Sequence, residues 1–369
     1  MITKQTTTIL FQPPNGIGLG HISRLIAIAL TIRDKMPSWR LPFLVEGNCH
    51  SLLDNSSLPY ILFPTSEAIY DTDNWRTWPV EEREAVLFKL ADCIIRVLQP
   101  DIILFDTFPC IPVMKAAARL EVPIALCIRK VKNMQKYFAY MIKYYQELKY
   151  LSLILVPHEP DEVEVPGYLA TKTRFVGQIV RSARKTHTSM DFPANSKIVV
   201  ITGGGGGYSN TAEFYNWALT SFASSRIRNP DLVGVLITGP LFKDWWKLRV
   251  VDGVRVIPFD PNLSATLAAA DLIICQAGYN TIAEVLHLVC PVICVPADRL
   301  WDNQYERAEW AAASNANFHI CRTLDTDELT HLIDSCLQNL HKTRSGVDVF
   351  SMGATRAADA LFELIANRP

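Results

Sequence analysis

A histidine in a glycine-rich loop is the first candidate for chemistry. The segment 13–21 reads PPNGIGLGH, and it lies between an apolar, strand-like run and a helical pattern. Glycines let a backbone approach a ligand closely, and a helix N-terminus attracts anions. His21 has the pKa to take a proton from a hydroxyl near neutral pH, so we predict a general base there. The alternative is a histidine held by backbone carbonyls in a tight loop.

The same loop fits a dinucleotide fingerprint only in part. Gly16 and Gly18 match the first two glycines of G-x-G-x-x-G, but His21 occupies the third position. A side chain there spoils the close packing of helix on strand that the fingerprint needs. The sequence therefore disfavours a bound NAD, and we expect no cofactor.

A second glycine-rich loop, 202–208, reads TGGGGGY. Consecutive glycines can form a nest of N–H groups for an anion. No Gly-Lys-Ser/Thr follows, so the loop is not a P-loop. An anion site that includes Gly203 and Gly204 and a plain strand-to-helix turn both remain open.

The segment 276–284, QAGYNTIAE, pairs a helix start with a carboxylate. Gly278 should end a buried strand, and the next helix should begin at Asn280 or Thr281. The free N–H groups of such a helix suit a diphosphate. Glu284 lies about one turn further, where it could accept both hydroxyls of a ribose. The alternative for Glu284 is a surface or ion-paired carboxylate.

A fourth loop, 296–304, crowds polar side chains at a helix start. Its end reads Asp302-Asn303-Gln304. Such residues are either N-caps or ligands for sugar hydroxyls. From this loop alone, capping is the better interpretation.

Apolar runs and helical patterns alternate along the whole chain and must position these loops. Continuous apolar strands separated by helices indicate an α/β fold with parallel sheets covered on both faces. A polar break at 177–194 divides the chain, with about five strands on each side. We expect a domain at 1–180, a linker at 181–195 and a domain at 196–369, and the final helix, 354–366, could pack on either domain. The expected strands are 7–11, 42–45, 101–105, 123–127, 151–156, 197–201, 232–238, 254–257, 272–275 and 291–295.

Composition excludes several classes of protein. The 369 residues carry a net charge of −1, so no basic field exists to hold nucleic acid. No apolar run in the N-terminal third is long enough to span a membrane, and residues 1–5 lead directly into a strand without a signal core. The nine cysteines form no zinc set, so we expect reduced thiols and a cytoplasmic protein.

The four loops together resemble the GT-B glycosyltransferases, especially the family of the peptidoglycan N-acetylglucosaminyltransferase (glycosyltransferase family 28 C-terminal domain). The resemblance implies two doubly wound Rossmann-like domains that face a central cleft. It assigns the acceptor to the N-terminal domain and a nucleotide sugar, usually a UDP-sugar, to the C-terminal one. The segments that carry it are NGIGLGHISR at 15–24, VGQIVR at 176–181, ITGGGGG at 201–207 and CQAGYNTIAEVLHLVCPVICVPADRLWDNQYERA at 275–308.

The resemblance also implies roles for particular residues. In the family, the nucleobase of the donor is recognised by backbone near the position of Phe259. The ribose is held by the residue that matches Glu284, and phosphate is contacted by the one that matches Arg181. His21 lies on the acceptor side as the candidate base. The donor sugar is held by Asn303 and Gln304, but the family's Asp-Arg-Gln-Gln signature reads Asp302-Asn303-Gln304 here, so the identity of the sugar stays open. The remaining implied residues are Gly278, Tyr279, Asn280 and Thr281 for the diphosphate, Gly203 and Gly204 for the donor, and Gly16, Gly18 and Gly20 on the acceptor side.

Two further signals have competing interpretations. Asp71 and Asp73 form a D-x-D, which binds a metal–diphosphate pair in another glycosyltransferase fold; we expect no metal here. The segment 129–151 is basic and rich in tyrosine. It could contact an acceptor or an anionic membrane surface, or be an amphipathic helix with its rings packed on the sheet.

These observations predict an inverting, metal-independent hexosyltransferase or N-acetylhexosaminyltransferase. It would move a sugar from a UDP-sugar to a small-molecule or lipid acceptor, without binding nucleic acid. The alternatives are a nucleotide-sugar hydrolase of the same fold and a non-catalytic nucleotide-sugar-binding protein. Peripheral membrane contact and the oligomeric state stay open.

Overall fold

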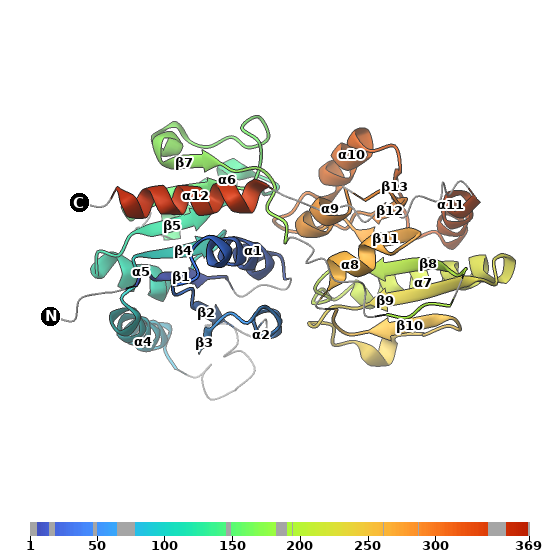
Figure 1. The fold of residues 1–369 in the computed structure, drawn as a ribbon, viewed down its shortest axis with the longest axis horizontal. Coiled ribbons are helices and arrows are strands. Elements are labelled where there is room, and N and C mark those ends of the chain that lie inside the picture. Colours follow the sequence, from blue (N-terminus) through green and yellow to red (C-terminus); the bar gives the residue numbers. More distant parts are fainter. Residues whose placement is uncertain are drawn as a thin grey trace. The chain divides into compact units, whose positions relative to one another are not determined.

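The chain forms two compact units in the computed structural model (Figure 1). The first comprises Met1–Gly16, His21–Arg181 and Ser351–Pro369, and the second comprises Ile17–Gly20 and Ser182–Phe350. The residues that the structure describes are 6–14, 19–46, 50–64, 78–144, 149–181, 190–193, 195–260, 262–286, 288–338 and 352–367. Gly16, Gly18, the D-x-D at 71–73 and most of the expected linker, 182–189, lie outside them.

The first unit is built on a seven-stranded parallel sheet with the order β3-β2-β1-β4-β5-β6-β7. Its central strands are continuous apolar runs buried on both faces, as parallel strands covered by helices must be. The strands are β1 (Ile9–Gln12), β2 (Phe43–Glu46), β3 (Tyr60–Phe63), β4 (Ile102–Asp106), β5 (Ile124–Cys127), β6 (Leu151–Val156) and β7 (Thr173–Phe175).

Helices connect these strands. Pro112 lies in the first turn of α5, where its missing N–H leaves no helical hydrogen bond unmade. Gln99, whose backbone is left-handed, caps the C-terminus of α4 just before Pro100. The helices of this unit are α1 (Gly20–Lys35), α2 (Ser51–Ser56), α4 (Val80–Leu98), α5 (Ile111–Arg119), α6 (Met134–Tyr144), the 3₁₀ helix η3 (Gly167–Lys172) and α12 (Met352–Ala366).

The last helix, α12, packs on the first unit. Phe362 meets the ring of Trp39 edge-on at 5.1 Å, and Lys35 of α1 pairs with Asp359. Gly353 lies against the backbone of Gln178, and a Cβ at Gly353 would come within 2.0 Å of the Gln178 carbonyl oxygen. The chain therefore returns to its N-terminal half after completing the second unit.

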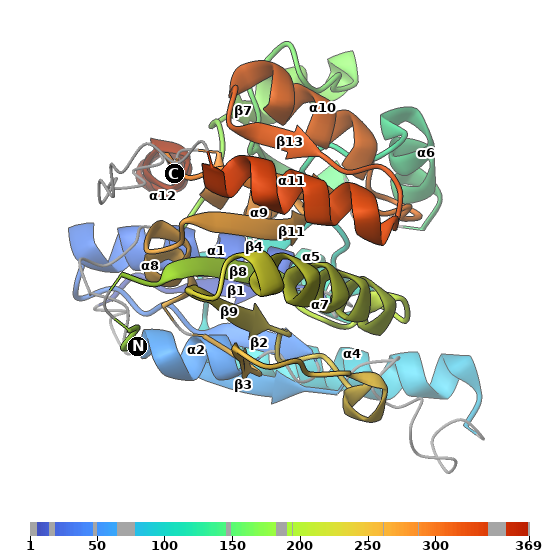
Figure 2. The same cartoon turned by 90° about the vertical axis from the view of Figure 1, so that its right-hand side faces the viewer.

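The second unit contains a six-stranded parallel sheet with the order β10-β9-β8-β11-β12-β13. The helices α7 and α11 lie side by side against it (Figure 2). The elements are β8 (Lys197–Thr202), α7 (Thr211–Arg228), β9 (Leu232–Ile237), the 3₁₀ helix η4 (Trp245–Lys247), β10 (Val254–Ile257), α8 (Leu263–Ala268), β11 (Leu272–Gln276), α9 (Tyr279–Val285), β12 (Val292–Val295), α10 (Gln304–Ser314), β13 (Phe318–Ile320) and α11 (Thr326–Gln338).

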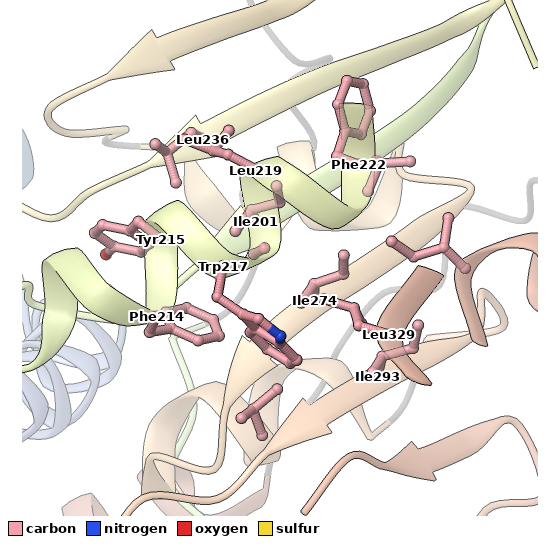
Figure 3. Packing of buried hydrophobic residues seen from close by; sticks show 14 of the residues in the cluster. Ile201, Phe214, Tyr215, Trp217, Leu219, Phe222, Leu236, Ile274, Ile293 and Leu329 are labelled. Atoms are coloured by element: carbon pink, nitrogen blue, oxygen red, sulfur yellow. The ribbon is translucent and has the colours of Figure 1, made fainter. Parts of the chain in front are cut away.

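Aromatic side chains from α7 fill the core of this unit. Phe214, Trp217 and Phe222 pack among aliphatic side chains of the sheet and of α11, such as Ile274 and Leu329 (Figure 3). The core fixes the strands, and the strands in turn fix the loops that follow their carboxyl ends.

Each sheet has one place where the strand order reverses. In the first sheet this place lies between β1 and β4, and in the second it lies between β8 and β11. Open α/β sheets bind ligands beyond the carboxyl ends of the strands at such a place. The loops after these four strands are therefore where a site should form.

The expected α/β class with parallel sheets is confirmed. The expectation of about five strands on each side is wrong, because the sheets have seven and six. The missed strands β3, β7 and β13 all lie at sheet edges, and two of them have only three residues. Strands this short leave no alternation or apolar run to recognise.

Candidate functional site

His21 faces a carboxylate at the strand reversal of the first sheet. It is the second residue of α1, and its Nδ1 lies 2.6 Å from Oδ1 of Asp106, the last residue of β4. A carboxylate can only accept, so Nδ1 of the neutral ring carries the hydrogen and Nε2 presents its lone pair. The imidazole is 19% exposed, whereas Asp106 is fully buried. This is the tautomer that a general base requires.

A buried arginine holds the other side of Asp106. Arg24, three residues after His21 on α1, donates from Nε to Oδ2 and from Nη2 to Oδ1, both at 2.8 Å. It is only 1% exposed. Thr107 Oγ1 adds a third donor at 2.8 Å from Oδ1. Asp106 is thereby fixed in position as an anion beside the imidazole.

Burial and charge set the protonation of this cluster. Burial alone would raise the pKa of Asp106, but attraction to Arg24 and His21 and their hydrogen bonds outweigh it and hold that pKa well below its ordinary value. Burial lowers the pKa of His21; Asp106 opposes this shift, while the charges of Arg24 and Arg129 add to it. The pKa of His21 therefore lies below 6.5, and the ring is neutral near pH 7.

Sequence reasoning missed Asp106 and Arg24. Arg24 could have been found, because a spacing of three residues places it on the same helical face as His21. Asp106 is 85 residues away from His21, and only the pairing of β1 with β4 brings it close. The signal that was available is a polar residue at the end of an apolar strand.

The basic, aromatic segment at 129–151 forms α6 over part of its length. Tyr137, Phe138 and Met141 are buried, and the Tyr137 hydroxyl donates to the Thr107 carbonyl at 2.6 Å. Lys136 and Lys143 are exposed. α6 is thus an amphipathic helix whose Tyr137 ring packs inward and supports the turn after Asp106, whereas Tyr150, beyond the helix, is exposed.

In the second unit, α9 begins one residue earlier than expected. Gly278 is its N-cap and Tyr279 its first residue, so the expected starts at Asn280 and Thr281 are wrong by one or two residues. The cap residue lies in extended backbone, which needs no glycine in itself. The N–H groups that follow remain the predicted contacts of a diphosphate.

The glycine run after β8 is partly occupied by the protein itself. The N–H of Gly203 donates to the Tyr215 hydroxyl at 3.1 Å, and that of Gly204 to Thr202 Oγ1 at 3.2 Å. Gly206 has a positive φ, and a Cβ there would lie 2.2 Å from the Thr238 carbonyl oxygen. These contacts favour the strand-to-helix turn over an open nest at Gly203 and Gly204.

Glu284 is 7% exposed, so it is not a surface carboxylate. Its position inside α9, after the Gly278 cap, is the one expected for a ribose ligand. Phe259 is half-buried and follows β10 at the carboxyl edge of the same sheet. Arg181, also half-buried, belongs to the first unit, and its Nε is buried without a hydrogen-bond partner.

The polar residues before α10 have structural roles. Asn303 caps the helix by accepting from the Glu306 N–H at 3.3 Å, and Gln304 Oε1 accepts from the Ala297 N–H at 3.0 Å. Asp302 pairs with Arg307 at 2.6 Å. Capping is thus observed, and contact of these residues with a donor sugar stays a prediction.

Comparison with known proteins identifies the matching domain. Residues 198–359 match the model of the glycosyltransferase family 28 C-terminal domain. A relative from Bacillus cytotoxicus is 24% identical over 285 residues, 73% of this chain and 74% of its own. It is named UDP-N-acetylglucosamine–N-acetylmuramyl-(pentapeptide) pyrophosphoryl-undecaprenol N-acetylglucosamine transferase.

Solved structures show the same fold over nearly the whole chain. Acinetobacter baumannii MurG is 16% identical, has a TM-score of 0.53 and covers 98% of each chain. A Listeria monocytogenes protein named for UDP-N-acetylglucosamine 2-epimerase activity is 10% identical, with a TM-score of 0.66 over 99% of this chain and 98% of its own. At these identities the likeness shows the fold alone.

Residues 198–359 thus match a glycosyltransferase domain, and the whole chain has the GT-B fold of solved glycosyltransferases. More particularly, it resembles the family of the peptidoglycan N-acetylglucosaminyltransferase, as its four loops indicated.

Two kinds of feature are absent from the residues that the structure describes. None of the helices there is long and apolar enough to cross a membrane. No group of three or more His, Cys, Asp or Glu residues in the same part of the chain could hold a metal ion.

Proposed function

We propose that this protein is an inverting glycosyltransferase in which His21, oriented by Asp106, deprotonates the acceptor hydroxyl. The donor is a nucleoside-diphosphate sugar, for which we favour a UDP-sugar, and the acceptor is a small molecule or a lipid. The observation that carries the proposal is the 2.6 Å contact between His21 Nδ1 and Asp106, because it leaves Nε2 as the basic atom.

The proposed reaction uses this geometry. The acceptor oxygen attacks the anomeric carbon from the face opposite the diphosphate, and its proton passes to Nε2 of His21. The bond between the anomeric carbon and the diphosphate oxygen breaks, and its electron pair leaves with the nucleotide. Asp106 stabilises the imidazolium that forms, while Arg24 keeps Asp106 ionised.

The second unit would hold the donor. In this proposal the first N–H groups of α9 face the diphosphate, and Glu284 accepts the ribose hydroxyls. Arg181 adds positive charge, so the proposal needs no metal ion to offset the leaving group. The relatives support this donor class and a lipid-linked acceptor, because their names specify UDP-N-acetylglucosamine and an undecaprenol pyrophosphate.

The test is UDP release from UDP-sugars, measured with and without candidate acceptors and with a chelator present. Acceptor-dependent release, with the sugar found on the acceptor in the inverted configuration, is the expected result. Release without acceptor supports the hydrolase, and binding without release supports a non-catalytic protein. Loss of activity with the chelator contradicts metal-independent transfer.

A further inference from the structure

Arg299 is a buried cation that forms no ion pair with the acidic residues that the structure describes. It lies in the loop between β12 and α10 and is 8% exposed. The acidic charges of Asp302 and Asp298 act on its guanidinium without forming an ion pair with it in the described part of the chain. Asp298 is exposed, and Asp302 is engaged by Arg307. Isolating a cation in this way is costly, since charges that leave water need a counter-charge.

Neutral groups hold the guanidinium in place. Its Nη1 donates to Asn210 Oδ1 and its Nη2 to Gln276 Oε1, both at 3.0 Å. The ring of Tyr208 stacks on one face, with its centroid 3.5 Å from Cζ. The Nε atom is buried and has no hydrogen-bond partner. The two side-chain amides accept only two of the five N–H hydrogens of the guanidinium. The N–H at Nε can therefore still donate a hydrogen bond to a ligand.

The position of Arg299 indicates a ligand. Its three partners come from the loop after β8 and from the end of β11, the two strands between which the order of the second sheet reverses. Arg299 reaches them from the loop after β12. The cation is thus held at the edge where doubly wound sheets bind their ligands. None of the residues that the family resemblance assigns to the donor supplies this charge from the second unit.

We propose that Arg299 is an anion-binding residue that contacts a negatively charged group of the sugar donor. The inference rests on the proposed nucleotide-sugar donor. The anion is either the diphosphate or a carboxylate carried by the sugar, because a guanidinium edge recognises both in the same two-pronged way. Tyr208 is exposed, so the aromatic ring that covers one face of the guanidinium is itself in contact with solvent.

The experiment is calorimetry with uridine, UDP, UDP-N-acetylglucosamine and UDP-glucuronate on the wild type and on Arg299→Gln and Arg299→Lys. Arg322→Gln is the matched control, since that exposed arginine pairs with Glu309. If the diphosphate is the anion, Arg299→Gln should weaken the three charged ligands by about 10- to 100-fold and leave uridine unchanged. If a sugar carboxylate is the anion, only UDP-glucuronate should weaken.

Arg299→Lys keeps the positive charge but loses the planar, two-pronged guanidinium. Its affinities for the charged ligands should therefore lie between those of the wild type and Arg299→Gln. If Arg299→Gln does not fold, the affinities of Arg299→Lys still test whether Arg299 contacts the anion. Wild-type affinity for every ligand in a folded Arg299 variant overturns this inference alone and makes Arg299 a cross-link between loops. Failure of the wild type to bind any of the nucleotides overturns the proposed function as well.

Discussion

Arg24 and Asp106 form a buried, two-pronged ion pair at the carboxyl edge of the first sheet. Both contacts measure 2.8 Å, and His21 meets the same carboxylate from the neighbouring turn of α1. The pair does two things for the imidazole: it fixes the hydrogen on Nδ1 and it places a positive charge nearby, which lowers the pKa of His21. An aspartate alone would do only the first.

Asp106→Asn should reduce turnover by about 10²- to 10⁴-fold, because the amide neither stabilises the imidazolium nor fixes the tautomer. It should also destabilise the fold by about 3–5 kcal/mol, since Arg24 is left buried and uncompensated. Steady-state kinetics and denaturant unfolding measure the two effects separately. Turnover near that of the wild type in a folded variant contradicts the role of Asp106.

Two substitutions of Arg24 separate the effect of its charge from that of its two-pronged contact with Asp106. Arg24→Lys keeps the positive charge but loses the two-pronged contact with Asp106, so turnover should fall by about tenfold. Loss of the guanidinium in Arg24→Met removes a charge that lowers the pKa of His21, so the acid limb should shift to higher pH. A merely structural role for Arg24 predicts lower stability with an unmoved limb. Arg33→Lys, in the last turn of the same helix, is the control.

The acid limb of the wild type follows from the lowered pKa of His21. The base form exists above that pKa, so activity should persist as pH falls to 6.5 and decline only below it. The same shift affects stability. In the window between the folded pKa and 6.5 the unfolded chain binds more protons, so the free energy of unfolding should rise with pH there. In His21→Gln this contribution to the slope should vanish, which unfolding curves at several pH values would show.

Glu284→Gln should weaken UDP binding by about 1–3 kcal/mol, the usual effect of losing a charged hydrogen-bond partner. The comparison ligand is 2′-deoxy-UDP, which lacks one of the hydroxyls. The wild type should prefer UDP over it, and the variant should lose most of that preference. An unchanged preference in a folded variant removes Glu284 from the ribose contact.

The sheets were predictable because their inner strands are uninterrupted apolar runs, such as Ile102–Asp106 and Leu272–Gln276. The edge strands β3, β7 and β13 were not predicted, and β7 and β13 are only three residues long, so only their neighbours define them. The return of α12 to the first unit was also open, because its apolar face fits either sheet. The contact that decides it, Gly353 against Gln178, joins residues far apart in the chain.

The candidate site was predictable where it lies within one loop. The glycines around His21 made it a candidate base, and the distance of Glu284 from Gly278 made it a candidate ribose ligand; both roles stay predictions. Asp106 and the environment of Arg299 were not found, because each depends on strands that are distant in sequence and adjacent in the sheet. Asn303 shows the reverse case: the local signal for capping was correct, and the structure assigns it that role.

His21→Ala tests the central claim most directly. The imidazole belongs to the first unit, and the proposed donor contacts of Gly278 and Glu284 belong to the second. Loss of the imidazole should therefore impair proton transfer without impairing donor binding. Turnover with a good acceptor should fall by about 10²- to 10⁴-fold, while calorimetric affinity for the UDP-sugar stays near that of the wild type. A folded His21→Ala protein that transfers sugar at close to the wild-type rate would contradict the account.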